Sequence, residues 1–210
     1  MQQRGMFGVT LLPVAFAVKD EGDNGKLAWG PIMVDGEHPR SHLAGGVALF
    51  EANGKVQDLY ISTTIVRDSN SPGGCLHRLD PQTGKVLTTW LPSEANPACV
   101  GGLTDVSLDN EGVIYVGVRG QKKGFTAPET KGRMYALKKE GDKYRVLWSL
   151  EVDDNLDYAS PAIGPDGGIY FGSTSGYAPG DVFSGFFKPV QDGSNYNSAD
   201  PVLYGVHDSE

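Results

Sequence analysis

The chain has 210 residues, of which 29 are glycine and 13 are proline, so one residue in five favours a turn; average usage is nearer about one in eight. Its apolar content of 39% and its charged content of 21% exclude a disordered chain. No apolar run approaches the roughly 18 residues of a membrane-spanning helix, and the net charge of -8 argues against nucleic acid or anionic lipid as the main partner.

The N-terminal region has two competing interpretations. Arg4, the apolar stretch over residues 6–14 and the triplet Ala15-Phe16-Ala17 are typical of a secretory signal with its cleavage site. The same region also matches a β-hairpin that recurs later in the chain, with a polar turn before Leu27-Ala28-Trp29. Because a signal peptide is not expected to align with an internal repeat, we favour a folded hairpin over residues 14–33.

An internal repeat of 55 residues follows. Its landmarks are the triplets Leu59-Tyr60-Ile61, Ile114-Tyr115-Val116 and Ile169-Tyr170-Phe171, which are each 55 residues apart. Each triplet comes after a short apolar segment and a polar turn with glycine, and this order predicts a β-hairpin. We therefore expect Tyr60, Tyr115 and Tyr170 to have equivalent structural roles.

A second hairpin completes each unit and ends near a tryptophan. The only three tryptophans, Trp29, Trp90 and Trp148, are 61 and 58 residues apart. Four short antiparallel strands per unit with a recurring aromatic residue are the signature of a β-propeller blade. We predict that the three tryptophans are equivalent and structural, each covering the gap between adjacent blades.

The predicted fold is all-β, a single β-propeller segment of four-stranded antiparallel blades over residues 1–210. The units are a partial one over residues 7–34, two full ones over 44–92 and 102–150, and a last one over 158–206. This is about 3.5–4 blades, fewer than most propellers contain. The chain could belong to a longer propeller, close one ring with a second copy, or form a small ring of four.

Two stretches resemble a known repeat family. Residues 160–173 resemble the first hairpin of a PQQ-like, or quinoprotein-type, propeller repeat, and residues 78–87 resemble its second hairpin. The resemblance covers nearly all of residues 14–206 and is specific for the repeat type rather than for an activity. Members of the family include periplasmic alcohol and sugar dehydrogenases and an outer-membrane assembly lipoprotein that acts as a scaffold.

The chain departs from the family pattern at several positions. Trp90 falls two residues later than expected, Arg78 replaces a small residue, and Lys138 and Lys139 stand where an aspartate is usual. The quinone-dependent members also carry two adjacent cysteines at the cofactor, and no Cys-Cys pair occurs in this sequence. The resemblance therefore implies that PQQ does not bind here, and we expect no cofactor.

The residues most able to carry chemistry form no specific motif. His38 and His42 flank Pro39, which argues against the helix that a metal-binding pair at this spacing needs. The acidic runs over residues 151–157 and 192–200 could bind Ca²⁺ but lack a calcium-loop pattern, so solvated loops are the simpler interpretation. We identify no catalytic, cofactor-binding or metal-ligating residues.

The two cysteines, Cys75 and Cys99, leave two alternatives open. They are predicted to lie at the same face of the sheets, where a disulfide is geometrically allowed if their Cα atoms come within about 7 Å. Such a bond would indicate an oxidising compartment. The other interpretation is two unrelated buried thiols.

Two long insertions are predicted to lie on one face of the propeller. The insertion over residues 174–201 is a candidate binding loop because it is rich in aromatic residues. These are Tyr177, Phe183, Phe186, Phe187 and Tyr196. A second insertion over residues 122–131 is basic.

The leading functional hypothesis is a non-catalytic PQQ-like propeller module, periplasmic or extracellular, that binds or scaffolds. Its expected partners are another protein, the remaining propeller blades or a second copy of the chain, with neither nucleic acid nor a transmembrane segment. One alternative is part of a quinoprotein-type dehydrogenase that uses PQQ and Ca²⁺. Another is a propeller hydrolase or lyase. Because all three rest on fold analogy, the sequence leaves them open.

Overall fold

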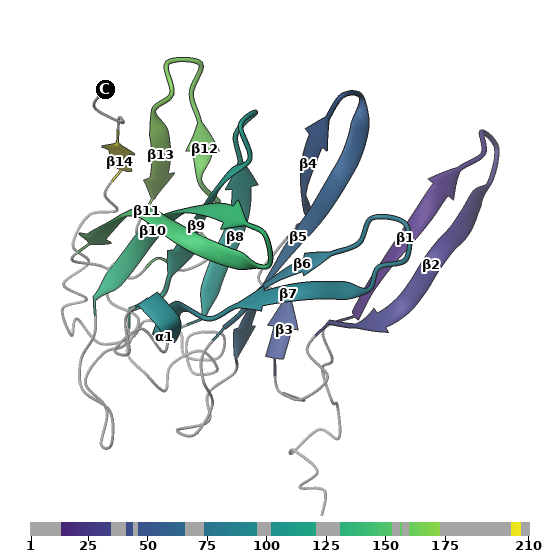
Figure 1. Cartoon of the computed structure of the whole chain (residues 1–210), viewed down its shortest axis with the longest axis horizontal. Coiled ribbons are helices and arrows are strands. Elements are labelled where there is room, and N and C mark those ends of the chain that lie inside the picture. Colours follow the sequence, from purple (N-terminus) through teal and green to yellow (C-terminus); the bar gives the residue numbers. More distant parts are fainter. Residues whose placement is uncertain are drawn as a thin grey trace, which may run out of the picture.

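The computed structural model describes residues 14–34, 41–43, 46–65, 74–95, 102–120, 131–152, 156, 160–172 and 203–206. Within these residues the protein is all-β, with antiparallel strand pairs throughout and one four-residue helix, α1 (Pro92–Ala95). The strands form four sheets that follow one another in chain order (Figure 1). The prediction of an all-β chain built from antiparallel sheets is therefore confirmed.

The second sheet is an antiparallel meander with one additional strand. Its four main strands pair in chain order, and the long second strand continues beyond them to pair with a short preceding strand that the repeat pattern did not predict. The additional strand is β3 (Ser41–Leu43); the others are β4 (Ala48–Ala52), β5 (Lys55–Ile65), β6 (Leu76–Leu79) and β7 (Val86–Trp90).

The third sheet is a four-stranded meander in which each strand pairs with its sequence neighbour. Its strands are β8 (Leu103–Leu108), β9 (Val113–Val118), β10 (Gly132–Glu140) and β11 (Lys143–Val152). Because this sheet has all four strands of the predicted unit, it serves as the reference for the sheets at the two ends.

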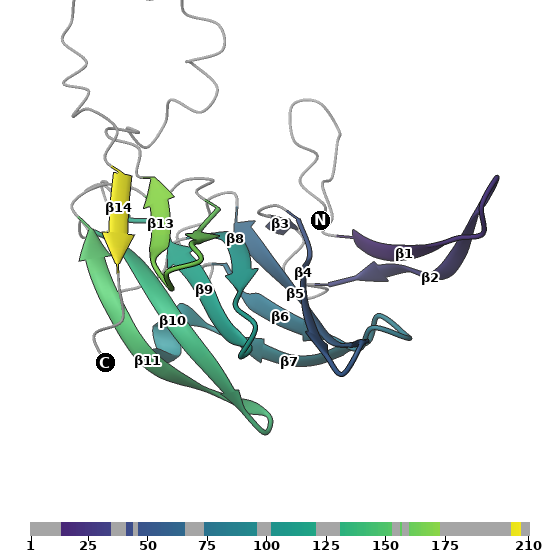
Figure 2. The same ribbon diagram turned by 90° about the horizontal axis from the view of Figure 1, so that it is seen from above.

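The first and last sheets contain fewer strands. The first is the hairpin of β1 (Val14–Asp20) and β2 (Gly25–Met33), and the last comprises β12 (Ala162–Ile163), β13 (Ile169–Gly172) and β14 (Leu203–Val206). The two lie at opposite ends of the described structure (Figure 2). The β1–β2 hairpin matches the folded interpretation of residues 14–33.

Turn chemistry explains where the hairpins reverse. Asn53 and Gly54 join β4 to β5 with φ angles of 54° and 69°. A two-residue turn with positive φ at both positions matches the right-handed twist of the strands that it joins, and Asn-Gly tolerates it best. In the β8–β9 turn, Asp109 Oδ1 instead accepts the backbone N–H of Glu111 and of Val113.

Apolar layers fill the spaces between successive sheets. One joins the β1–β2 hairpin to the second sheet, one joins the second sheet to the third, and one joins the third sheet to the last. Their buried members include Ala15, Leu59 and Ile61 in the first layer; Tyr60, Trp90, Ile114 and Val116 in the second; and Tyr115, Met134, Ile169 and Phe171 in the third.

Because side chains alternate along β5 and β9, the second and third sheets each contribute apolar residues on both faces. Leu59 and Ile61 face the preceding hairpin, whereas Tyr60 faces the following sheet. Tyr115 likewise faces the following sheet. Tyr170 occupies the same place in β13, where it is half-buried and its hydroxyl lies 3.0 Å from Asp166 Oδ2.

The tryptophans occupy two different register positions. Trp29 pairs with Ala17 and Trp148 pairs with Ala136, and each pair lies beside a β-bulge. In the second sheet the pair beside the bulge is Arg78 and Thr88, so this position holds no tryptophan. Trp90 lies two residues further on and pairs with Leu76. The expectation of three equivalent tryptophans is thus corrected for Trp90, as its displacement in the repeat pattern had indicated.

Trp29 links the first hairpin to the second sheet directly. Its indole Nε1 donates a hydrogen bond of 2.9 Å to the carbonyl of Pro81, and its ring lies against Gly84 in the same turn. Gly84 has a φ of 70°, and a Cβ there would meet the indole ring at 2.4 Å. Glycine is therefore required both by the backbone conformation and by the close approach of the ring.

Trp90 is the buried anchor between the second and third sheets. Its side chain is 2% exposed and meets the Tyr135 ring edge-on, with ring centres 5.3 Å apart. We predict that Trp90→Ala lowers the free energy of unfolding by about 3–5 kcal/mol, because it leaves a cavity in the apolar layer. Leu87→Ala, at an exposed site in the same strand, should cost less than about 1.5 kcal/mol. Equal losses in denaturant melts would contradict this assignment.

Candidate binding site

Several residues singled out in the sequence lie outside the described residues. These are the aromatic residues of the candidate binding loop, Tyr177, Phe183, Phe186, Phe187 and Tyr196, together with Cys99 and most of the two acidic runs. Cys75 is buried next to the start of β6, and its disulfide with Cys99 stays a prediction. His77 is buried in β6, with Nδ1 3.0 Å from Thr89 Oγ1.

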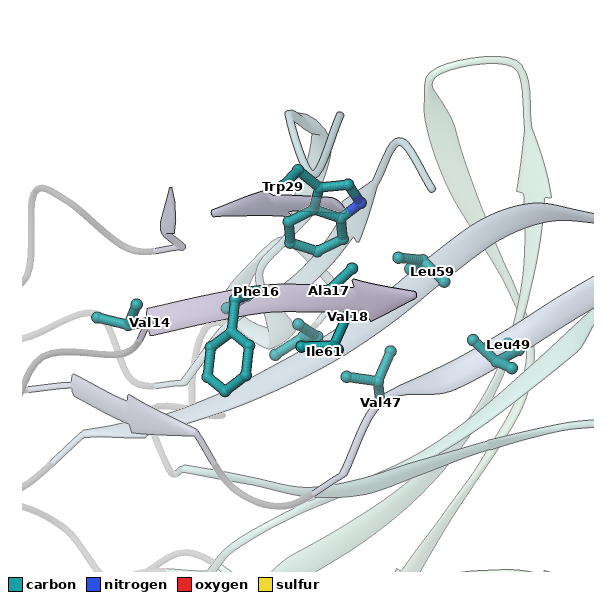
Figure 3. Close-up of a pocket in the computed structure, with 10 residues that line it drawn as sticks. Val14, Phe16, Ala17, Val18, Trp29, Val47, Leu49, Leu59 and Ile61 are labelled. Carbon is teal, nitrogen blue, oxygen red and sulfur yellow. The ribbon is translucent and has the colours of Figure 1, made fainter. Parts of the chain in front are cut away.

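An apolar groove lies between the first hairpin and the second sheet (Figure 3). It has a volume of about 370 Å³ and runs between β1 and the β4–β5 hairpin. All of the residues that line it are apolar, and they come from both sides. They are Val14, Ala15, Phe16, Ala17, Val18 and Trp29 from the first hairpin and Val47, Leu49, Leu59 and Ile61 from the second sheet and the residue before it.

The groove gathers large apolar side chains that remain in contact with solvent. Phe16 is 64% exposed and Leu49 is 57% exposed, and Val18 and Val47 are also exposed. Large contiguous apolar patches are uncommon on monomeric proteins and mark interaction surfaces. This groove is therefore the strongest candidate binding site among the described residues.

Comparison with the other sheets shows why Leu49 is unusual. Leu49 pairs with Leu59 just as Leu108 pairs with Ile114 and as Ile163 pairs with Ile169. Both counterparts are partly buried against an apolar layer. The preceding sheet supplies that cover, since β4 packs against β8 and β8 packs against β12. No described strand lies on β4 in the corresponding way.

The groove contains no group for acid–base or nucleophilic chemistry. None of its lining side chains is ionisable, and general acid–base catalysis needs a positioned titratable side chain. No group of three or more His, Cys, Asp or Glu side chains able to hold a metal ion occurs in the part of the chain that the structure describes. The arrangement is suited to binding an apolar surface.

The main charged cluster lies elsewhere, between the second and third sheets. Asp58 of β5 is 2% exposed and pairs with Arg78 Nε at 2.6 Å and with Lys139 Nζ at 2.9 Å. Arg78 and Lys139 are two of the departures from the family pattern, and they converge on one carboxylate. This ion pair ties β5 and β6 to β10 of the next sheet, and we assign it a structural role.

Two tyrosines beside this cluster have raised pKa values, chiefly because they are buried. Burial of the phenol, followed by the negative charge of Asp58, raises the pKa of Tyr60 well above its ordinary value. Burial also raises the pKa of Tyr144, whose hydroxyl lies 3.0 Å from Thr88 Oγ1. Both phenols therefore remain protonated at neutral pH and act as neutral contacts between the sheets.

Comparisons with protein-family models, with curated proteins and with solved structures gave no match. Separately, no helix among the described residues is long and apolar enough to cross a membrane. The site must therefore be interpreted from its own geometry.

The groove was not among the site residues predicted from the sequence. Residues 14–33 match only the second hairpin of the repeat. That match gave no residue-level signal for the groove, because the exposure of Leu49 depends on which of the described strands lie against β4.

The Asp58 cluster leads to a stability prediction. Asp58→Asn should lower the free energy of unfolding by about 2–4 kcal/mol, because it leaves Arg78 and Lys139 without their buried counter-charge. Asp142→Asn is the matched control, since Asp142 is 89% exposed and lies 3.8 Å from Arg78 Nη1. Its effect should stay below about 0.5 kcal/mol. Similar losses for both variants in urea melts would refute the structural role of Asp58.

The raised pKa of Tyr60 leads to a prediction about alkaline pH. The unfolded chain releases the Tyr60 proton at about pH 10, whereas the native chain retains it. The contribution of this protonated phenol to the free energy of unfolding is therefore complete below that pH and is lost progressively above it. The loss should reach about 1.4 kcal/mol per pH unit. Tyr60→Phe should show a correspondingly shallower decline in unfolding free energy above about pH 10. Identical slopes for the two proteins would show that the Tyr60 pKa is not raised.

Proposed function

We propose that this chain is a non-catalytic binding or scaffolding module of the PQQ-like propeller type, exported from the cytosol, that binds a polypeptide partner through the groove between β1 and β4. One observation carries the proposal. Leu49 is exposed where Leu108 and Ile163, its counterparts in the next two sheets, are packed against an apolar layer.

The chemistry of the groove favours a macromolecular partner over a small polar substrate. Its lining offers apolar contact area and a strand edge, whereas small-molecule sites usually add a few convergent polar side chains that fix the orientation of the ligand. The described turns and ion pairs support sheet packing, so none of them supplies a competing active site. The propeller type rests on the repeat pattern and on the resemblance stated above. The exported location rests on that resemblance and on the predicted Cys75–Cys99 disulfide.

Site-specific cross-linking tests the proposed binding surface. A photoreactive amino acid is placed at Leu49, with Leu87 as the matched control because it is also exposed but lies on β7, away from the groove. We expect one defined polypeptide segment, identified by mass spectrometry, to cross-link at position 49 and not at position 87. The yield of this cross-link should fall about tenfold in a protein that also carries Phe16→Lys. Equal cross-linking at both positions would overturn the proposal.

A cofactor titration separates this function from the dehydrogenase alternative. PQQ with Ca²⁺ is titrated into the full chain and followed by absorbance. We expect no saturable change, because the chain lacks the adjacent cysteines of the quinone-dependent members. Stoichiometric binding would instead favour the oxidoreductase.

A further inference from the structure

We draw no further inference here: the strongest candidate, the exposed apolar surface that Phe16 and Val18 of β1 form with Leu49 of β4 at the groove between the first hairpin and the second sheet, belongs to the binding site already proposed, and nothing in the structure shows whether another part of this protein, a second copy or a different polypeptide covers it.

Discussion

The second and third sheets of this protein are apolar on both faces, and that constraint determines the rest of the architecture. Because side chains alternate along a strand, β5 and β9 each direct aliphatic residues to the preceding sheet and a tyrosine to the following one. A sheet with two apolar faces must have both of them covered. The sheets before and after it in the chain provide this cover, and the sheets therefore stack in chain order. The same requirement supports the proposal that the partly covered face of β4 binds a partner, since covering Leu49 would remove apolar area from water.

Polar contacts select which sheets adjoin and in which register. Trp29 reaches across to the turn that contains Pro81 and Gly84 by a hydrogen bond and a ring contact. At the next interface Thr88 occupies the corresponding position and meets Tyr144, while Asp58 joins Arg78 to Lys139. A buried carboxylate is tolerated only when its charge is compensated, so these residues depend on one another across two sheets.

The proposed binding role rests on two features of the groove. A strand edge supplies directional hydrogen bonds, and the neighbouring apolar face supplies the area that makes such pairing stable in water. Natural proteins usually protect sheet edges against unwanted association. Among the described strands β1 pairs only with β2, and its other edge lies beside exposed Phe16 and Leu49, which supports the proposed binding surface.

The sequence by itself determined the hairpins, because their signals are local: Asn53-Gly54 specifies a turn, and the 55-residue spacing of the tyrosines specifies repeated strands. It also indicated that Trp90 is displaced. It did not predict β3, which depends on pairing with the far end of β5, nor the meeting of Arg78 and Lys139 at Asp58. The groove was likewise hidden, since Leu49 resembles any other strand residue in the sequence. Only the tertiary structure decided these features, because each depends on which residues distant in the chain lie side by side, and which do not.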